Sequence, residues 1–245
     1  METVCITGAS AGIGEATARR FHALGHKVVL VARRQDRLAK LKEELGATIL
    51  QLDVSDLIAV QKAAPAMKDV SILVNNAGLA AGLDPAQRAQ IADWQQMIAT
   101  NINGVLHMTH TLLPQMVAAK RGHIINLGSV AGTYPYANGN VYGATKAFLR
   151  QFTLNLKSDL LGTPVRVTSI EPGLVETEFS QVRFRGDETK AKAVYADMQP
   201  LSADDIADTI VWATTRPAHV NINAIEIMPV AQAFAGFSVD RKANS

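Results

Sequence analysis

Hydrophobic residues along this chain form short runs that alternate with longer amphipathic stretches. Most of the short runs are nearly continuous in Val, Ile and Leu, which is typical of parallel strands covered on both faces. These runs predict strands at residues 3–7, 27–32, 48–54, 72–75, 123–127, 165–170 and 224–228. Apolar residues at helical spacing predict helices at residues 13–24, 35–45, 57–67, 93–120, 141–161 and 203–215.

Strand and helix alternate over the whole chain, which predicts an α/β fold with a Rossmann-type, doubly wound parallel sheet of about seven strands and helices on both faces. The chain has 245 residues, 48% of them apolar, so a single domain spanning residues 1–245 is expected to carry every site. The stretch 172–200 is long for a connection in such a fold. Long insertions of this kind often form lids or binding loops, and we expect a substrate loop here.

Charge and cysteine content narrow the classes of function. The formal net charge is +2, and acids and bases are interleaved, so the sequence indicates no nucleic-acid surface. Cys5 is the only cysteine, which excludes a disulfide within the chain. The chain shows neither a signal-peptide pattern nor an apolar run of about 20 residues. We therefore expect a cytoplasmic protein that binds neither nucleic acid nor a membrane.

A glycine-rich turn lies between the first predicted strand and the first predicted helix. Gly8, Gly12 and Gly14 have the spacing GxxxGxG, and Ser10 and Ile13 lie between them. Glycines allow the backbone to approach a pyrophosphate, whose charge the helix N-terminus favours. This context predicts a dinucleotide site, to which Ser10 adds a hydroxyl donor. The alternative is a tight turn that is rich in glycine by coincidence.

Two arginines, Arg33 and Arg34, follow the second predicted strand. A site for NAD usually has an acid there, which binds the ribose 2′-hydroxyl. A guanidinium instead suits a 2′-phosphate, so the expected cofactor is NADP(H). The alternative is that both arginines are solvated residues at the start of a helix.

Tyr142 and Lys146 are four residues apart in a predicted helix, so their side chains share one face. A phenol titrates near ~10, and a neighbouring ammonium lowers that pKa, which suits proton transfer. A Tyr and a Lys at this spacing are also common by chance. Ser129, thirteen residues before Tyr142, adds a hydroxyl to the pattern.

The order and spacing of these motifs resemble the short-chain dehydrogenases/reductases over essentially the whole chain. Residues 7–14 match the cofactor turn of that family, residues 75–78 its Asn-Asn-Ala-Gly turn, and residues 172–177 its PGxVxT segment. The resemblance implies further cofactor contacts from Asp53, Val54, Asn76, Ala77, Gly78, Pro172, Gly173, Val175 and Thr177.

The same resemblance implies a catalytic set of Asn101, Ser129, Tyr142 and Lys146. Ser129 would orient the substrate oxygen, and Tyr142 would exchange a proton with it. Lys146 would lower the Tyr142 pKa and bind the nicotinamide ribose, so this pair would also contact the cofactor. Asn101 would hold a water that extends the proton path. Hydride transfer belongs to the cofactor and needs no metal.

Four segments narrow the resemblance within the family. Residues 134–142, 171–175, 182–187 and 221–230 resemble the NADP-dependent 3-hydroxy acid dehydrogenases. That resemblance implies a small hydroxy acid substrate, such as L-serine, L-allo-threonine or 3-hydroxypropionate, oxidised at its 3-hydroxyl. Arg183 and Arg185, in the 172–200 stretch, are candidates to bind its carboxylate, and the resemblance favours Arg183. The alternatives are solvated loop charges or contacts to another subunit.

Two other functions stay open. One is a broad NADPH-dependent carbonyl or 3-oxoacyl reductase, although the TGQ…DGG ending typical of 3-oxoacyl reductases is absent. The other is an NADP-binding sensor without activity, against which the complete catalytic set argues. The family resemblance also implies a homotetramer, with the predicted helices at 93–120 and 141–161 as interface elements.

Overall fold

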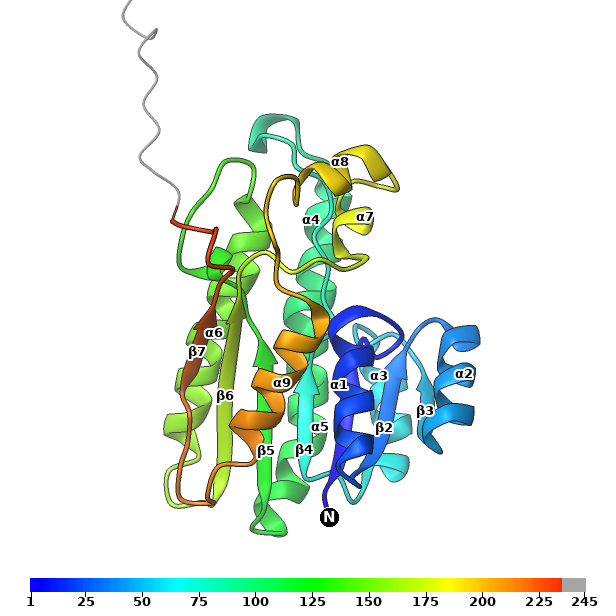
Figure 1. Cartoon of the computed structure of the whole chain (residues 1–245). Coiled ribbons are helices and arrows are strands. Elements are labelled where there is room, and N and C mark those ends of the chain that lie inside the picture. Colours follow the sequence, from blue (N-terminus) through cyan, green and yellow to red (C-terminus); the bar gives the residue numbers. More distant parts are fainter. Residues whose placement is uncertain (235–245) are drawn as a thin grey trace, which may run out of the picture.

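The computed structural model describes residues 1–234, in which seven strands form one parallel sheet with the order β3-β2-β1-β4-β5-β6-β7 (Figure 1). The strands are β1 (Thr3–Thr7), β2 (Lys27–Ala32), β3 (Thr48–Gln51), β4 (Ile72–Asn75), β5 (Gly122–Leu127), β6 (Val165–Pro172) and β7 (Ala224–Ile227). The chain starts in the middle of the sheet, builds outward to β3, and then crosses to β4 and the other half. This topology confirms the predicted doubly wound fold.

Helices cover both faces of the sheet (Figure 1). One face carries α1 (Gly12–Ala23), α2 (Gln35–Leu45) and α9 (Ala203–Thr214). The other carries α3 (Leu57–Ala63), α5 (Gly104–Ala118) and α6 (Asn140–Asp159). Short 3-10 helices occur at Ala64–Met67, Ala86–Arg88 and Val130–Gly132. None of the helices between residues 1 and 234 combines the length and apolar character that crossing a membrane requires.

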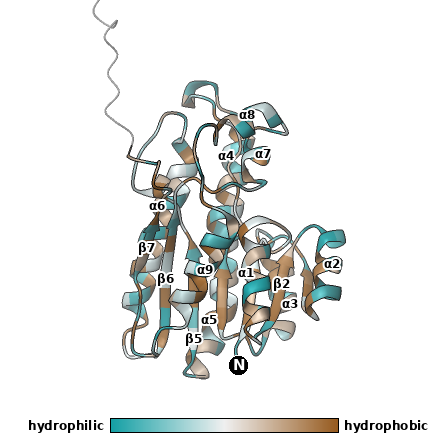
Figure 2. Cartoon of the chain, in the orientation of Figure 1, coloured by the Kyte–Doolittle hydropathy of each residue, from teal (hydrophilic) through white to brown (hydrophobic). Residues whose placement is uncertain are grey.

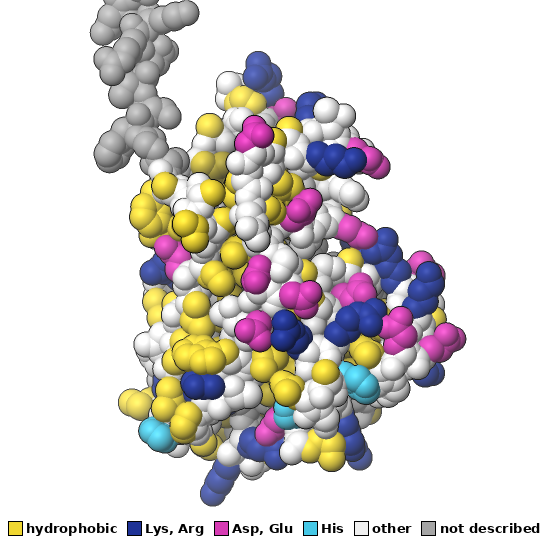
Figure 3. Space-filling model, viewed as in Figure 1, with side chains coloured by type: hydrophobic (Ala, Val, Ile, Leu, Met, Phe, Trp, Pro, Cys, Tyr) yellow, Lys and Arg dark blue, Asp and Glu magenta, His cyan; other side chains and the backbone are white. Residues whose placement is uncertain are grey.

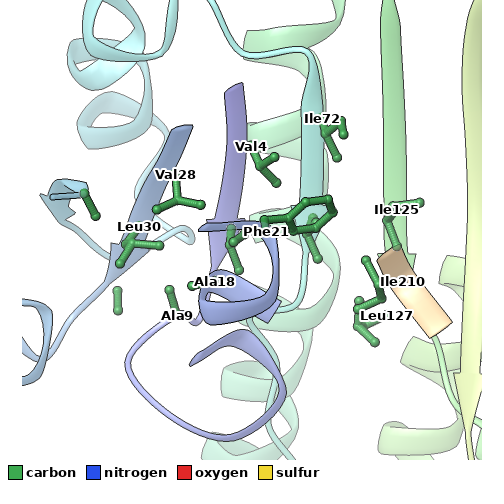
Figure 4. Packing of buried hydrophobic residues seen from close by; sticks show 14 of the residues in the cluster. Val4, Ala9, Ala18, Phe21, Val28, Leu30, Ile72, Ile125, Leu127 and Ile210 are labelled. Carbon is green, nitrogen blue, oxygen red and sulfur yellow. The ribbon is translucent and has the colours of Figure 1, made fainter. Parts of the chain in front are cut away.

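Alternate residues of the central strands enter two separate cores. On β1, Val4 and Ile6 pack with Phe21 of α1, as Figure 4 shows for Val4 and Phe21. Cys5, between them, belongs to the opposite core. Because both faces of each central strand are buried, the strands are hydrophobic along their length (Figure 2). On the face in Figure 3, in contrast, acidic and basic side chains are interspersed.

The predicted helix at residues 93–120 is interrupted in the structure. It consists of α4 (Ile91–Ile98), a π-helical turn at Ala99–Asn103, and α5. The extra residue in a π turn breaks the regular helical period, which apolar spacing alone does not reveal. Asn101 lies inside this turn and is 1% exposed.

The predicted strand at residues 48–54 ends earlier, at Gln51. The Asp53 carboxylate accepts hydrogen bonds from the Ser55 backbone N–H at 2.9 Å and from the Ser55 hydroxyl at 2.7 Å. Such a local bond bends the chain out of the ladder. Asp53 therefore lies at the carboxyl end of β3, where it faces the site described below.

The stretch 172–200 contains two short helices, α7 (Phe179–Arg183) and α8 (Glu188–Ala193). The side chain of Asp187 accepts a hydrogen bond from the Lys190 backbone and so caps α8. Figure 1 shows both helices beyond the carboxyl end of the sheet, close to α4. We call residues 172–200 the lid segment, after the function that the sequence predicts for them.

Candidate active site

A cleft of about 620 Å³ lies along the carboxyl end of the sheet. Residues that directly follow β1, β2, β4 and β5 line this cleft, together with the lid segment, as expected for ligand sites in open α/β sheets. The predicted cofactor residues that line it are Gly8, Ser10, Gly12, Ile13, Arg33, Arg34, Asp53, Val54, Asn76, Ala77, Gly78, Pro172, Gly173, Val175 and Thr177. Ser129, Tyr142, Lys146 and Arg183 line it too, whereas Gly14, Asn101 and Arg185 do not.

Hydrogen bonds with the loop after β4 hold the glycine turn in place. Gly8 has φ +66°, and a Cβ on Gly14 would lie 2.5 Å from the Gly8 carbonyl oxygen, so the turn closes only with glycine there. The Thr7 hydroxyl accepts hydrogen bonds from the Asn76 and Ala77 N–H groups at 3.0 and 2.9 Å. No side chain caps the start of α1, so its first N–H groups are available to an anion in the cleft.

Arg33 lies at one end of the cleft, where its side chain is 63% exposed. Its Nη1 is 3.6 Å from Oδ2 of Asp53, across the ends of β2 and β3. Burial acts to raise the pKa of Asp53, but the Ser55 hydrogen bonds and the Arg33 charge hold it below its usual value. The carboxylate is therefore ionised at neutral pH and beside a cation.

Arg34 connects this end of the cleft to the lid segment. Its Nε donates to the Ser10 hydroxyl at 3.0 Å, and its Nη1 donates to Glu178 at 2.8 Å. Arg37 donates to the same carboxylate at 2.6 Å. Hydrogen bonds from Arg34 and Arg37 hold the pKa of Glu178 below its usual value. Glu178 thus bridges the lid segment to the start of α2.

Tyr142 lies in the first turn of α6 and Lys146 in the second, which places Nζ of Lys146 5.8 Å from the Tyr142 ring centroid. Ser129 follows β5, and its hydroxyl accepts from the Ala131 N–H at 3.1 Å and donates to the Pro172 carbonyl at 3.3 Å. The fold thus gathers the Ser, Tyr and Lys predicted from separate motifs at one wall of the cleft.

Burial is the largest cause of the pKa shifts of Tyr142 and Lys146. It raises the pKa of Tyr142 to about 12, although a Ser129 hydrogen bond and the Arg183 charge act to lower it. It also lowers the pKa of Lys146 to about 8. The Lys146 ammonium donates to the Leu127 carbonyl at 2.6 Å. The predicted lowering of the Tyr142 pKa by Lys146 is not among the causes of this shift, and the ammonium is instead bonded to a backbone oxygen.

The Asn101 side chain is fully engaged inside the protein. Its Oδ1 accepts from the Leu79 N–H at 2.9 Å, and its Nδ2 donates to the Leu79 carbonyl at 2.9 Å and to the Thr145 hydroxyl at 3.0 Å. These bonds tie the π-helical turn to the loop after β4 and to α6. Asn101 therefore supports the wall that carries Tyr142, and its predicted role toward a water stays a prediction.

The two candidate arginines of the lid segment have different surroundings. Arg183 lines the cleft and donates to the Tyr136 hydroxyl, with its guanidinium carbon 5.7 Å from the Tyr142 ring centroid. Arg185 instead forms an ion pair of 2.5 Å with Asp93 of α4. Of the two, Arg183 is the one that lies beside the predicted catalytic tyrosine.

Some residues of the cleft have no counterpart among the predicted site residues. Tyr136, Phe179, Gln232 and Phe234 line it, and the Phe179 ring lies 5.7 Å from that of Tyr142. The Gln232 side chain accepts a hydrogen bond from the Leu174 N–H at 2.8 Å. Tyr136 lies in the segment 134–142, whose only signal in the sequence is its resemblance to the 3-hydroxy acid dehydrogenases. Gln232 and Phe234 follow β7 without any motif, so only the fold could reveal them.

Comparison with known protein families identifies the family. The family described as short chain dehydrogenase matches residues 2–188, which is most of the chain. The chain belongs to the short chain dehydrogenase family. The resemblance seen in the sequence motifs is thereby confirmed, and so is the class of enzyme that it implied.

Individual relatives are similar over nearly their whole length. The NADP-dependent 3-hydroxy acid dehydrogenase YdfG of Salmonella typhi is 56% identical, over 97% of this chain and 99% of the relative. Serine 3-dehydrogenase of Agrobacterium fabrum is 52% identical, over 98% of each. A solved structure, the closed form of serine dehydrogenase complexed with NADP⁺, matches with a TM-score of 0.96 and 53% identity over 98% of this chain and 100% of that one.

Proposed function

We propose that this protein is an NADP(H)-dependent dehydrogenase that oxidises the 3-hydroxyl of small 3-hydroxy acids. L-Serine, L-allo-threonine and 3-hydroxypropionate are the substrates expected, and the reverse reaction reduces the matching semialdehydes and 3-keto acids. The observation that carries this proposal is Arg183, a cation inside the cleft beside Tyr142. The names of the similar enzymes support the same substrate class.

NADP(H) is the cofactor, and the donors along the cleft fit it. The uncapped start of α1 suits a pyrophosphate, and Arg33, Arg34 and Ser10 suit a 2′-phosphate. The structure with TM-score 0.96 is complexed with NADP⁺, which supports the assignment. When bound, NADP(H) would supply the hydride chemistry, and the residues that line the cleft would hold it in place.

The side chains around Tyr142 perform the proton chemistry. Ser129 holds the substrate 3-oxygen, and Tyr142 takes its proton during oxidation or gives one back during reduction. Lys146 keeps a positive charge one helical turn away. Phe179 packs near the Tyr142 ring and limits the access of water to the reacting oxygen.

The carboxylate of the substrate binds Arg183. A guanidinium pairs with a carboxylate through charge-assisted hydrogen bonds, which are worth about 1.5–3 kcal/mol each. In a 3-hydroxy acid, the carboxylate is two carbons from the hydroxyl. The nearness of Arg183 to Tyr142 therefore suits an acid whose hydroxyl lies close to its carboxylate, as in a 3-hydroxy acid.

A substrate series tests this function. With NADP⁺, 3-hydroxypropionate should have a kcat/KM at least about tenfold above that of its methyl ester or of 1-propanol, because only the free acid satisfies Arg183. Equal activity on the three compounds would support a broad carbonyl reductase instead. Binding of NADPH without turnover of any acid would support a sensor.

We also infer a homotetramer in the cytoplasm. Apolar side chains remain partly exposed on the two predicted interface elements, with Val117 on α5 36% exposed and Leu154 on α6 40% exposed. A reducing compartment suits a chain whose one cysteine is free and buried. Analytical ultracentrifugation should give four times the chain mass, and Leu154→Glu should lower it.

A further inference from the structure

The Arg183 guanidinium is held between two tyrosines. Its Nη2 donates to the Tyr136 hydroxyl, and its central carbon lies 5.4 Å from the Tyr136 ring centroid and 5.7 Å from that of Tyr142. These distances are those of cation–π contacts. The position of the cation next to Tyr142 therefore depends on Tyr136.

Arg183 also has an N–H group without a hydrogen-bond partner among residues 1–234. Its Nε is buried and has no hydrogen-bond partner among residues 1–234, and no carboxylate of that range forms an ion pair with it. Arg185, two residues later, has such a partner in Asp93. A cation without an acid of its own, inside a cleft, is suited to an anion that arrives with the substrate.

The turn before α6 is built around the Tyr136 ring. A Cβ on Gly139 would lie 2.6 Å from two carbons of that ring, so the ring rests directly on the Gly139 backbone. Asn138 has φ +66°, a conformation that Asn tolerates better than most residues, and the Gly139 N–H donates to the Tyr136 carbonyl at 3.1 Å. Because α6 begins at the next residue, the same turn places Tyr136 and Tyr142.

We propose that Tyr136 is a specificity-determining residue, which clamps Arg183 and shares the binding of the substrate carboxylate. The Tyr136 oxygen accepts the Arg183 N–H, so its own proton is free to be donated to a carboxylate oxygen. Burial raises the pKa of Tyr136 in spite of the Arg183 charge, so the phenol keeps that proton at neutral pH. This inference rests on the proposed function, because it takes the substrate to be a free acid.

Tyr136→Phe isolates the hydroxyl and retains the ring. The variant should raise KM for 3-hydroxypropionate about tenfold, while kcat stays within about threefold of wild type. Kinetics on the neutral methyl ester should change much less, because an ester carbonyl forms no charge-assisted hydrogen bonds with the two donors. Tyr134→Phe is the matched control, since the Tyr134 hydroxyl bonds Glu226 and not Arg183.

Gly139→Ala is the second variant, because it displaces the ring and leaves the hydroxyl present. It should reproduce the KM effect on the acid, with normal kinetics on the ester as evidence of a folded site. An unchanged KM for the acid in Tyr136→Phe would overturn the clamp, as would an equal loss on acid and ester. Wild-type enzyme that turns over acid and ester equally would instead overturn the proposed function, and the clamp with it.

Discussion

The two ends of the cleft hold arginines in opposite settings. At the cofactor end, Arg33 and Arg34 have side chains 63% and 43% exposed, and each has an acid close by, Asp53 or Glu178. At the substrate end, Arg183 lies between tyrosine rings and has no acidic partner among residues 1–234. Exposed ion pairs contribute little and exchange readily, whereas a partly buried cation without an acidic partner attracts an incoming anion more strongly. A phosphate can therefore replace the acids beside Arg33 and Arg34, while Arg183 is available to an anion in the cleft.

The largest effect should come from the chemistry at the substrate end. Tyr142→Phe retains the ring that contacts Arg183 but removes the proton-carrying hydroxyl. Turnover should fall by roughly 10²–10⁴, and NADPH binding should stay near wild type. Steady-state rates with fluorescence titration of NADPH measure both. Substantial remaining turnover would mean that another group moves the proton.

Removal of the cation at the substrate end should be the next largest effect. Arg183→Ala should raise KM for free acids at least about 30-fold, because the loss of a hydrogen-bonded charge contact costs at least about 2 kcal/mol. Activity on neutral alcohols should hardly change. Arg185→Ala is the control, because its guanidinium pairs with Asp93 outside the cleft. If only Arg185→Ala shows the acid-specific loss, the function stands and the choice of arginine is wrong.

The pH dependence of oxidation should follow the pKa that burial gives Tyr142 at the substrate end. Oxidation requires deprotonated Tyr142, and burial raises its pKa to about 12, so the base form increases as pH rises. We expect kcat to rise by up to about tenfold per pH unit between about pH 6 and pH 8. Lys146, whose pKa is lowered to about 8, then begins to lose its charge. A flat profile over this range would contradict the role of Tyr142.

At the cofactor end, a charge reversal should change cofactor choice. Arg33→Asp should weaken NADP⁺ binding about tenfold or more relative to NAD⁺, because an acid repels the 2′-phosphate that the guanidinium attracts. The ratio of the two dissociation constants measures this directly. Equal losses for both cofactors would contradict the assignment of Arg33.

The smallest expected effect is that of salt, which should weaken binding at the cofactor end more than at the substrate end. The Debye length falls from about 10 Å to about 3 Å as ionic strength rises from about 0.1 M to about 1 M. KM for NADP⁺, bound by exposed arginines, should therefore rise several-fold, while KM for the acid should rise less. A greater salt effect on the acid would show that Arg183 is more open to solvent than its surroundings indicate.

Local patterns were enough for much of this protein. Continuous apolar runs predicted the strands, because both faces of a central parallel strand are buried and every position must be apolar. Glycine spacing and the pair of Tyr142 and Lys146 predicted a cofactor turn and a proton-transfer helix, because each depends on residues close together in the chain. The strand end at Gln51 was missed because the local hydrogen bonds of Asp53 to Ser55 leave no periodic signal. The π turn around Asn101 was missed because one extra residue in a helical turn does not alter the apolar pattern enough to be read.

Tertiary structure decided what lies around the substrate. Sequence alone left Arg183 and Arg185 as candidates two residues apart, and only the fold paired one with Asp93 and placed the other beside Tyr142. The same holds for Tyr136, which meets Arg183 from 47 residues away. Motifs record chemistry within one segment, but the charge balance of a cleft depends on which segments the fold brings together.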